Sequence, residues 1–213
     1  MSQATFHPDE VLNFWFPDSG HQNALESHGA FWTERMQGGM DDAIIANFAE
    51  LTMAAAIGEL DHWAESPRGR LALLVALDQF PRSLWRGTPG AYGQDIKAAR
   101  LAIEGIHNGD FNELLPWEQA FFVISITHCE GPEHLERMIW VKQVSDGIAN
   151  RLEGPLELMR EGFRNQNKII TDVIETFGRH PHRNAVLGRV STPDELIYIA
   201  KGEFPHLNKP HEV

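Results

Sequence analysis

The sequence is poor in cysteine, in long apolar runs and in positive charge. Its single cysteine, Cys129, cannot form a disulfide within the chain, which is typical of proteins in a reducing compartment. No apolar run approaches the roughly 20 residues that a membrane-spanning helix needs, so we expect no membrane association. The opening MSQATFHPDEV lacks the charged and apolar regions of a secretory signal. These absences predict a cytoplasmic protein.

Positive charge is scarce overall. The 213 residues include 30 Asp and Glu against 18 Lys and Arg, a net charge of −12. A chain this acidic repels phosphate backbones, so we expect no nucleic-acid partner. Apolar residues make up 42% and charged residues 23%, which is typical of a folded globular protein. At this length we expect one domain over residues 1–213.

Sheet and repeat patterns are missing as well. We find no convincing period-2 alternation, no Asn-Gly hairpin signal, no persuasive internal repeat and no low-complexity linker. The sequence also lacks the GxSxG motif of serine hydrolases and the HExxH motif of zinc proteases. It therefore predicts an all-α domain without a sheet, and it contains no recognised catalytic motif.

Proline marks the expected helix starts, because its fixed φ suits the first helical position and its missing N–H would have no partner there. We expect Ser66 to cap one helix and Thr192, with Glu195 three residues later, to cap another. The apolar spacing between the starts predicts about eight or nine antiparallel helices. These starts are at Pro8, Pro67, Pro116, Pro132, Pro155 and Pro193, and a further helix is expected to begin after Asp95.

The first polar group lies in LALLVALDQFPRSLWRGTPGAY, residues 71–92. The spacing places Asp78 on the apolar face of a central helix, where an unpaired carboxylate costs several kcal/mol. Pro81 is expected to end this helix, which leaves Arg82 and Arg86 in the following loop. We predict that Asp78 is buried and paired with one of these arginines. The pair is either structural, or it leaves one arginine to bind an anionic ligand through its planar guanidinium.

The second polar group is at the end of the helix that contains SITHCE. His128 falls beside apolar neighbours, where a lone histidine is more often a hydrogen-bonded core residue. Glu130 is a candidate to hold its imidazole and set the tautomer, which a general base or a metal ligand would also require. The spacing does not separate these roles. Cys129 is expected to be an inert small hydrophobe.

The third polar group is FGRHPHRNAVLGR, residues 177–189, which contains three arginines, two histidines and no acidic residue. Pro181 biases the preceding residue to an extended conformation, in which His180 and His182 lie on the same side and can in principle face one ion. No HExxH pattern or second dense Cys/His cluster accompanies them. We therefore expect no metal and no cofactor.

Several long segments of the chain match a known family. They are VLNFWF (11–16), GELDHWAESPRGRLAL (58–73), LDQFPR with RGTP (77–89), THCE (127–130), and FGRHPHRNAVLGR with STPDE (177–195). Through them the whole chain resembles the bacterial proteins grouped as domain of unknown function 924. The resemblance implies a helical, tetratricopeptide-like fold, and it implies no reaction.

The chain also departs from the family pattern. The family usually has an aromatic residue in place of His180, more often has serine in place of Cys129, and tends to have a histidine in place of Ile170. The resemblance therefore argues against a metal pair that includes His180 and against a catalytic Cys129. The residues of this segment that match the pattern, and that the resemblance favours, are His182, Arg183 and Asn184.

We expect these groups to form one site. The segment 179–184 should lie against residues 78–86, with His128 near the junction and the guanidinium groups within about 8–10 Å of each other. Asp78 and Glu130 are too few to balance the arginines, which predicts residual positive charge. The expected ligand-binding residues are Asp78, Gln79, Arg82, Arg86, His128, Glu130, Arg179, His182, Arg183 and Asn184.

Three functions fit such a site. The first is a binding module whose Arg- and His-lined groove takes a small anionic ligand or the carboxylate end of a peptide. The second is a metal-independent hydrolase that uses His128 or His182 as general base and arginines to stabilise negative charge. The third is a polar network with a purely structural role. The sequence does not indicate an oligomeric state.

Overall fold

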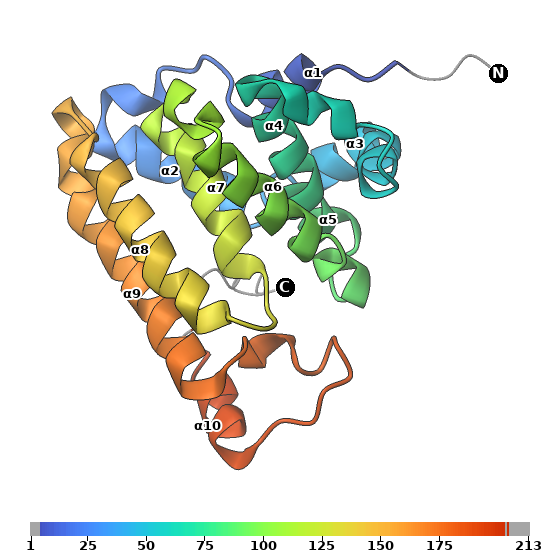
Figure 1. Cartoon of the computed structure of the whole chain (residues 1–213), viewed down its shortest axis with the longest axis vertical. Coiled ribbons are helices and arrows are strands. Elements are labelled where there is room, and N and C mark those ends of the chain that lie inside the picture. Colours follow the sequence, from blue (N-terminus) through green and yellow to red (C-terminus); the bar gives the residue numbers. More distant parts are fainter. Residues whose placement is uncertain (1–4, 203, 205–213) are drawn as a thin grey trace.

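The structure is a computed structural model that describes residues 5–202 and residue 204. Helices joined by short turns make up this part of the chain, and it contains no strand (Figure 1). With α4, a π turn and α5 counted as one rod, the described residues form nine helices, which confirms the prediction of eight or nine. A tetratricopeptide-like arrangement stays a prediction. The helices are α1 (Pro8–Trp15), α2 (Leu25–Met36), α3 (Asp41–Ala56), α4 (Pro67–Leu74), α5 (Phe80–Leu84), α6 (Asp95–His107), α7 (Pro116–His128), α8 (His134–Asn150), α9 (Arg160–Phe177) and α10 (Pro193–Lys201).

Most helices begin where the sequence predicts their first turn. α1, α4, α7 and α10 start at predicted prolines. Ser66 caps α4 by accepting a hydrogen bond from the Gly69 N–H at 3.2 Å. In the capping box of α10, the Thr192 hydroxyl accepts from the Glu195 N–H at 3.2 Å and the Glu195 carboxylate accepts from the Thr192 N–H at 2.7 Å.

Two helices start later than expected. α8 begins at His134, close to the predicted start at Pro132, because Glu133 takes up the left-handed conformation with φ 61°. α9 begins at Arg160, after a 3-10 helix over Gly154–Met159 that occupies the predicted start. Local proline signals therefore place these starts only to within a turn or two.

The rod that contains α4 is the centre of the apolar core. Every residue from Leu71 to Phe80 is buried, and α1, α6 and α7 pack around α4. Trp15 of α1 and Phe122 of α7 are among the largest fully buried side chains. Because the helix is buried on all sides, each polar group on it must find its partner within the protein.

A π turn over Val75–Gln79 joins α4 to α5. In this turn the Phe80 N–H reaches back five residues to the carbonyl of the first residue of the turn. Pro81 follows directly, and in a regular α-helix its ring would clash with the carbonyl four residues earlier. The expectation that Pro81 ends the helix is wrong: the wider turn accommodates it, and Arg82 lies within α5. Such π turns are frequent at functional sites.

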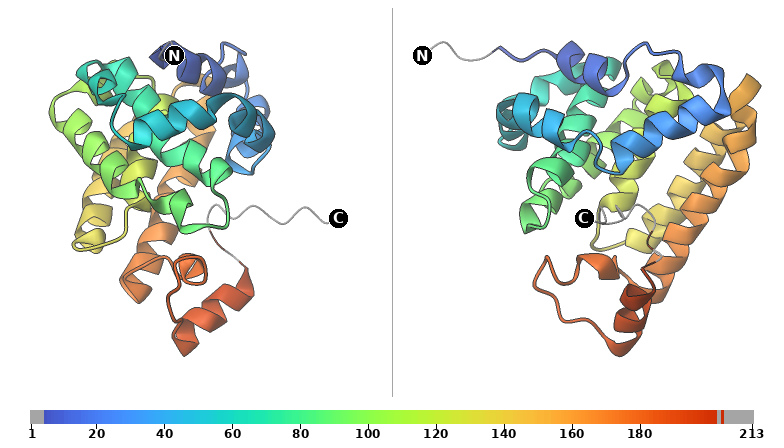
Figure 2. Two further views of the ribbon diagram at one scale, coloured as in Figure 1. Left: turned by 90° about the vertical axis from the view of Figure 1, so that its right-hand side faces the viewer. Right: turned by 180° about the vertical axis from the view of Figure 1, so that it is seen from behind.

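The chain returns to the end of α7 after α9. α8 and α9 form a long antiparallel pair along one side of the molecule (Figure 1). At Gly178 the backbone turns in the left-handed conformation, and residues 179–192 then run back below the end of α7 in this view (Figure 1). Figure 2 shows the same return from two other sides. In the described part of the chain, every helix is too short or too polar to cross a membrane.

Candidate functional site

The returning segment caps the C-terminal end of α7. The last carbonyls of an α-helix have no partner within the helix, and α7 has no glycine cap, because Cys129 follows it in an extended conformation. Instead, the Thr127 carbonyl accepts hydrogen bonds from His134 Nε2 at 3.2 Å and from His180 Nε2 at 3.1 Å. Since a carbonyl only accepts, both imidazoles carry a hydrogen on Nε2.

Two arginines complete this cap. Arg183 Nη1 donates to the His128 carbonyl at 2.8 Å, and Arg137 Nη2 donates to the Cys129 carbonyl at 2.7 Å. Cations are favourable at this place because the helix dipole leaves negative partial charge at the C-terminal end. The acidic protein thus concentrates arginine and histidine in residues 177–189 because this segment faces the end of α7.

Asp78 connects the π turn to the end of α7. Its side chain is 1% exposed, and its carboxylate contacts His128 Nδ1 at 2.9 and 3.1 Å and Arg82 Nη2 at 3.2 Å. The predicted burial of Asp78 and its pairing with Arg82 are confirmed. A carboxylate accepts hydrogen bonds, so it fixes His128 with a hydrogen on Nδ1. The expectation that Glu130 holds this imidazole is wrong, because Asp78 on the π turn occupies that position.

Asp95, the first residue of α6, joins two arginines of the site. One of its carboxylate oxygens accepts from Arg82 Nη2 at 2.9 Å and the other from Arg183 Nη1 at 3.0 Å. The Tyr92 ring faces both guanidinium groups, whose central carbons lie 5.7 and 4.5 Å from its centroid. Two groups on one carboxylate lie within the predicted range of about 8–10 Å, so the predicted proximity of the two segments is confirmed.

Neither Asp95 nor Tyr92 stands out in the sequence. An aspartate in the first turn of a helix is common because its negative charge interacts favourably with the helix dipole. This local role is enough to explain Asp95 in the sequence, so its pairing with two arginines is not apparent there. The signal that could have identified Asp95 is the excess of arginines over acids in the three polar groups, since a buried arginine requires a carboxylate.

Burial and charge act in opposite directions on the two arginines. Burial disfavours the charged form of Arg82, but the adjacent Asp78 and Asp95 carboxylates raise its pKa above the ordinary value. Burial lowers the pKa of Arg183, and Asp95 offsets this effect only in part because the charge of Arg82 adds to it. Asp95 is therefore the carboxylate that stabilises the buried charge of Arg183.

Glu130 forms a further ion pair beside this group. It accepts the His180 backbone N–H at 2.6 Å and contacts Arg189 Nη1 at 2.5 Å and Nη2 at 3.3 Å. Burial alone would raise the pKa of Glu130, but the hydrogen bonds from Arg189 and His180 and the charge of Arg183 hold it below the ordinary value. Glu130 thus fixes the returning segment as an ionised carboxylate.

The six charged groups of these ion pairs balance one another. Three carboxylates face three guanidinium groups, and the expected excess of positive charge is wrong for these residues because Asp95 supplies a carboxylate that was not expected. We call these six residues together with His128 the polar cluster. Its members are Asp78, Arg82, Asp95, His128, Glu130, Arg183 and Arg189.

Two of the predicted arginines belong to other ion pairs. Arg86 binds Asp41 of α3, with Nη2 at 2.7 and 2.8 Å from the two carboxylate oxygens. Arg179 binds Glu195 of α10, with Nε at 2.7 Å and Nη2 at 2.8 Å from its carboxylate oxygens. Neither arginine joins the polar cluster.

Of the other three predicted residues, Gln79 contacts the polar cluster, whereas Asn184 and His182 contact residues outside it. Gln79 donates from Nε2 to the carboxylate of the preceding aspartate at 2.5 Å. Asn184 donates from Nδ2 to the Ser191 hydroxyl at 2.9 Å. The ring of His182 lies 5.5 Å from the ring of His180, centroid to centroid. The structure thus brings to one place six of the ten predicted residues, namely Asp78, Gln79, Arg82, His128, Glu130 and Arg183.

Only part of the polar cluster reaches the surface. The Asp78 side chain is 1% exposed and that of Arg183 is 4% exposed, whereas those of Arg82 and His128 are 19% and 12% exposed. The two side chains that the buried Asp78 carboxylate contacts, Arg82 and His128, are thus both partly exposed. Within residues 5–202 and 204, no group of three or more His, Cys, Asp or Glu side chains is arranged to hold a metal ion.

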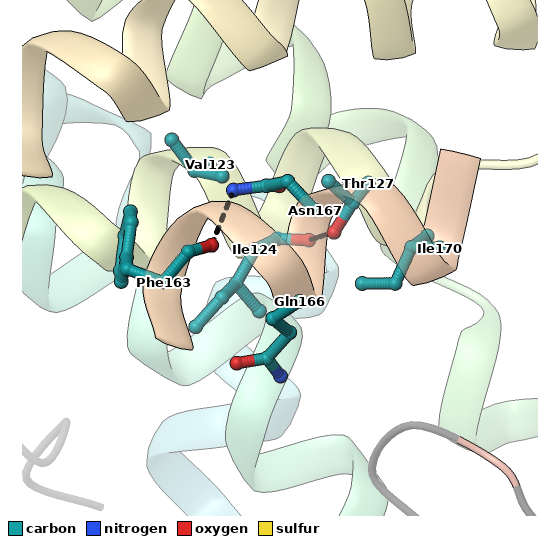
Figure 3. Close-up of a pocket in the computed structure, with 7 residues that line it drawn as sticks. All are labelled: Val123, Ile124, Thr127, Phe163, Gln166, Asn167 and Ile170. Atoms are coloured by element: carbon teal, nitrogen blue, oxygen red, sulfur yellow. Dashed lines mark hydrogen bonds between the residues drawn. The ribbon is translucent and has the colours of Figure 1, made fainter. Parts of the chain in front are cut away.

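A small hollow lies between α7 and α9 (Figure 3). At its wall, Asn167 donates from Nδ2 to the Phe163 carbonyl at 3.3 Å. The described residues that line the hollow include no member of the polar cluster, so the two features are separate. The lining residues are Val123, Ile124, Thr127, Phe163, Gln166, Asn167 and Ile170.

Comparison with known proteins identifies one solved structure and one family. The solved structure is a protein of unknown function, ATU0120, from Agrobacterium tumefaciens. It is 28% identical to this chain with a TM-score of 0.71, and the match covers 92% of this chain and 97% of that one. A search of curated proteins finds no match. The model of a family described as bacterial protein of unknown function (DUF924) matches residues 11–203. The chain therefore belongs to this family.

Proposed function

We propose that Arg82 and His128 bind a small molecule that carries a carboxylate or phosphate group, or the carboxylate end of a peptide. The observation that supports this proposal is the shared position of the two side chains. The buried Asp78 carboxylate holds Arg82 at 3.2 Å and His128 at 2.9 Å, and both are partly exposed. Donors that are fixed before binding lose little conformational entropy when a ligand arrives. Guanidinium and imidazolium groups form strong hydrogen bonds with oxyanions.

The charge balance of the polar cluster determines how an anion is held. An anion added to a balanced and mostly buried group of charges requires one compensating positive charge. A proton on His128 supplies it, because the protonated imidazole donates from Nδ1 to Asp78 and from Nε2 to the ligand. Binding therefore takes up one proton, and the affinity should rise as the pH falls.

A thermal-shift experiment tests this proposal. The probes are acetate, succinate, inorganic phosphate, and an N-acetylated dipeptide with either a free or an amidated C-terminus. A ligand that binds only the folded state stabilises it by about 2.7 kcal/mol at a hundredfold excess over Kd. We expect at least one of the acids to raise the melting temperature. If the peptide with the free carboxylate binds, its amidated counterpart should have no effect.

Variants locate the response. Arg82→Gln and His128→Gln should lose the shift, whereas Arg100→Gln, at an exposed arginine of α6, should keep it. If Arg82→Gln does not unfold cooperatively, Arg82→Lys replaces it, because lysine keeps the charge but loses the planar fork. A shift that is the same in the wild type and in both site variants would refute the proposal. The absence of any shift with all probes would leave the structural role as the better explanation.

A hydrolase is the second candidate, and the hydrogen bond between Asp78 and His128 Nδ1 favours it. A neutral imidazole held in this way can accept a proton at Nε2, as a general base does. This role requires neutral His128, so the rate should rise with pH, opposite to the pH dependence of anion binding. Hydrolysis of p-nitrophenyl acetate by the wild type and His128→Gln tests it. Equal rates for the two proteins would exclude His128 as the base for this ester.

A further inference from the structure

Two histidines, one from α8 and one from residues 179–189, share the Thr127 carbonyl at the end of α7. His134 comes from the start of α8 and His180 from the segment itself, and both are buried. Both donate from Nε2 to the Thr127 carbonyl, at 3.2 and 3.1 Å, and their ring centroids are 5.4 Å apart. The segment carries Arg183, so its attachment determines whether the polar cluster is complete.

This arrangement requires His134 to be neutral. Its Nδ1 atom is buried and has no hydrogen-bond partner among the residues that the structure describes. Protonation would place an N–H donor at that atom without an acceptor, and it would also add a buried charge. Burial lowers the pKa of His134 to about 4, and the charges of Arg137 and Arg183 also lower it. The hydrogen bond to the Thr127 carbonyl and the charge of Glu130 raise this pKa but do not offset the effect of burial.

His180 is in a similar environment. Burial lowers its pKa well below the ordinary value, and the charge of Arg183 acts in the same direction. The hydrogen bond to the Thr127 carbonyl opposes these effects. The charges of His182 and His128 also lower its pKa. The Glu130 carboxylate accepts its backbone N–H at 2.6 Å, and the His134 ring lies 5.4 Å from its own ring, centroid to centroid.

We propose that His134 and His180 act as a proton-sensitive latch, which holds residues 179–189 against the end of α7 at neutral pH and releases them on acidification. Release would separate Arg183 from Asp95 and from the carbonyl of His128. The regulatory consequence rests on the proposed function, because opening the latch dismantles the polar cluster to which Arg82 and His128 belong. The latch itself does not depend on any ligand.

The size of the effect follows from the two states of His134. Release removes His180 from its contact with the His134 ring and exposes His134; a solvated histidine has a pKa of about 6.5, whereas in the attached state the pKa of His134 is about 4. As the pH falls through this window, only the released state takes up the proton, so release is favoured. His134 alone raises the equilibrium constant for release about thirtyfold between pH 8 and pH 5, and His180 acts in the same direction.

Hydrogen exchange with mass spectrometry on the full chain without ligand tests the latch. Exchange is measured at about pH 8 and about pH 5, with labelling times scaled for the intrinsic pH dependence of exchange. We expect the protection of residues 179–189 to fall at least tenfold at the lower pH, and that of α4 to change little. Equal protection of residues 179–189 at the two pH values would overturn the proposal.

Glutamine variants isolate the protonation step. Glutamine places its amide nitrogen near the position of His Nε2, so it can donate to the Thr127 carbonyl but cannot take up a proton. The double variant His134→Gln/His180→Gln should keep the segment protected at both pH values, and His62→Gln, at an exposed histidine, should respond as the wild type does. A double variant that responds to acid like the wild type would overturn the proposal.

The single variant covers the case in which the double variant already exchanges fast at pH 8. His134→Gln alone should then lose most of the thirtyfold change expected from this histidine. An unchanged pH response in His134→Gln would contradict the latch. The readout is independent of the proposed function, because a working latch is compatible with a site that binds no anion.

Discussion

Substitution of Asp95 by asparagine removes the charge that two arginines share while it keeps the shape of the side chain. The carboxylate now accepts from Arg82 at 2.9 Å and from Arg183 at 3.0 Å, each on a different oxygen. The amide has one acceptor oxygen, so one arginine loses its partner. Arg183 is 4% exposed and cannot turn its charge toward water. The unpaired charge therefore stays buried.

The expected loss follows from these contacts. Removal of one partner from a buried ion pair costs about 3–5 kcal/mol. The amide oxygen retains one hydrogen bond, worth about 1 kcal/mol, and Arg82 keeps its contact with Asp78 at 3.2 Å. We therefore expect Asp95→Asn to lower the free energy of unfolding by about 2–4 kcal/mol. Urea unfolding followed by circular dichroism measures it.

A double-mutant cycle separates the ion pair from other effects of the substitution. Arg183→Met removes the guanidinium and keeps much of the apolar stem. In Asp95→Asn/Arg183→Met no charge of this pair is left unpaired, so the losses of the single variants should overlap by at least about 1.5 kcal/mol. The control is Asp61→Asn, at a carboxylate that is 56% exposed and pairs with Lys97, and it should cost less than about 1 kcal/mol. Equal losses for Asp95→Asn and Asp61→Asn, or strictly additive losses in the cycle, would refute the argument.

Three further results are expected. The free energy of unfolding should fall as the pH is lowered from about 6.5 to about 4, because burial lowers the pKa of His28 and of His134 to about 4 and only the unfolded chain takes up these protons in that range. Each histidine accounts for about 2 kcal/mol at pH 5. A free energy of unfolding from urea titrations that does not change with pH would contradict this. Gly147→Ala should raise the free energy of unfolding by about 0.5–1 kcal/mol, because an added Cβ meets no atom within 4 Å. Gly105→Ala should lower it by at least about 1 kcal/mol, because its Cβ would lie 2.5 and 2.7 Å from two side chains, and equal melting temperatures for the two variants would contradict this contrast. Ser66→Ala should cost about 1 kcal/mol through loss of the cap on α4, and an unchanged unfolding midpoint would show that the cap contributes nothing.

The sequence predicted the helices well because the residues that start a helix act within one turn. Ser66 and Pro67 need only the next few backbone groups to cap α4, and this contact is present. The continuation of the helix past Pro81 is different. From the local sequence alone, a proline is expected to end a helix. Here the whole segment 71–80 is buried, and the helix continues past the proline through a π turn.

The site was predicted in part for the same reason. The contact between Asp78 and Arg82 is between residues four apart on one helix, so spacing could reveal it. Asp95 and Arg183 are 88 residues apart, and they meet only because the chain returns to the end of α7 after α9. No local pattern encodes that return. The role of Asp95 and the resulting charge balance could therefore not be predicted from the sequence.

The central proposal is that Arg82 and His128, both held by Asp78, bind an oxyanion together. Proton–nitrogen correlation spectra of the histidine side chains, recorded at about pH 7 with increasing inorganic phosphate or succinate, follow His128 directly. We predict that its Nε2 signal moves toward the protonated position in the wild type while Nδ1 keeps its hydrogen. In Arg82→Gln this movement should be absent. A His128 signal that stays fixed in the wild type with both anions, or that moves equally in Arg82→Gln, would contradict the proposal.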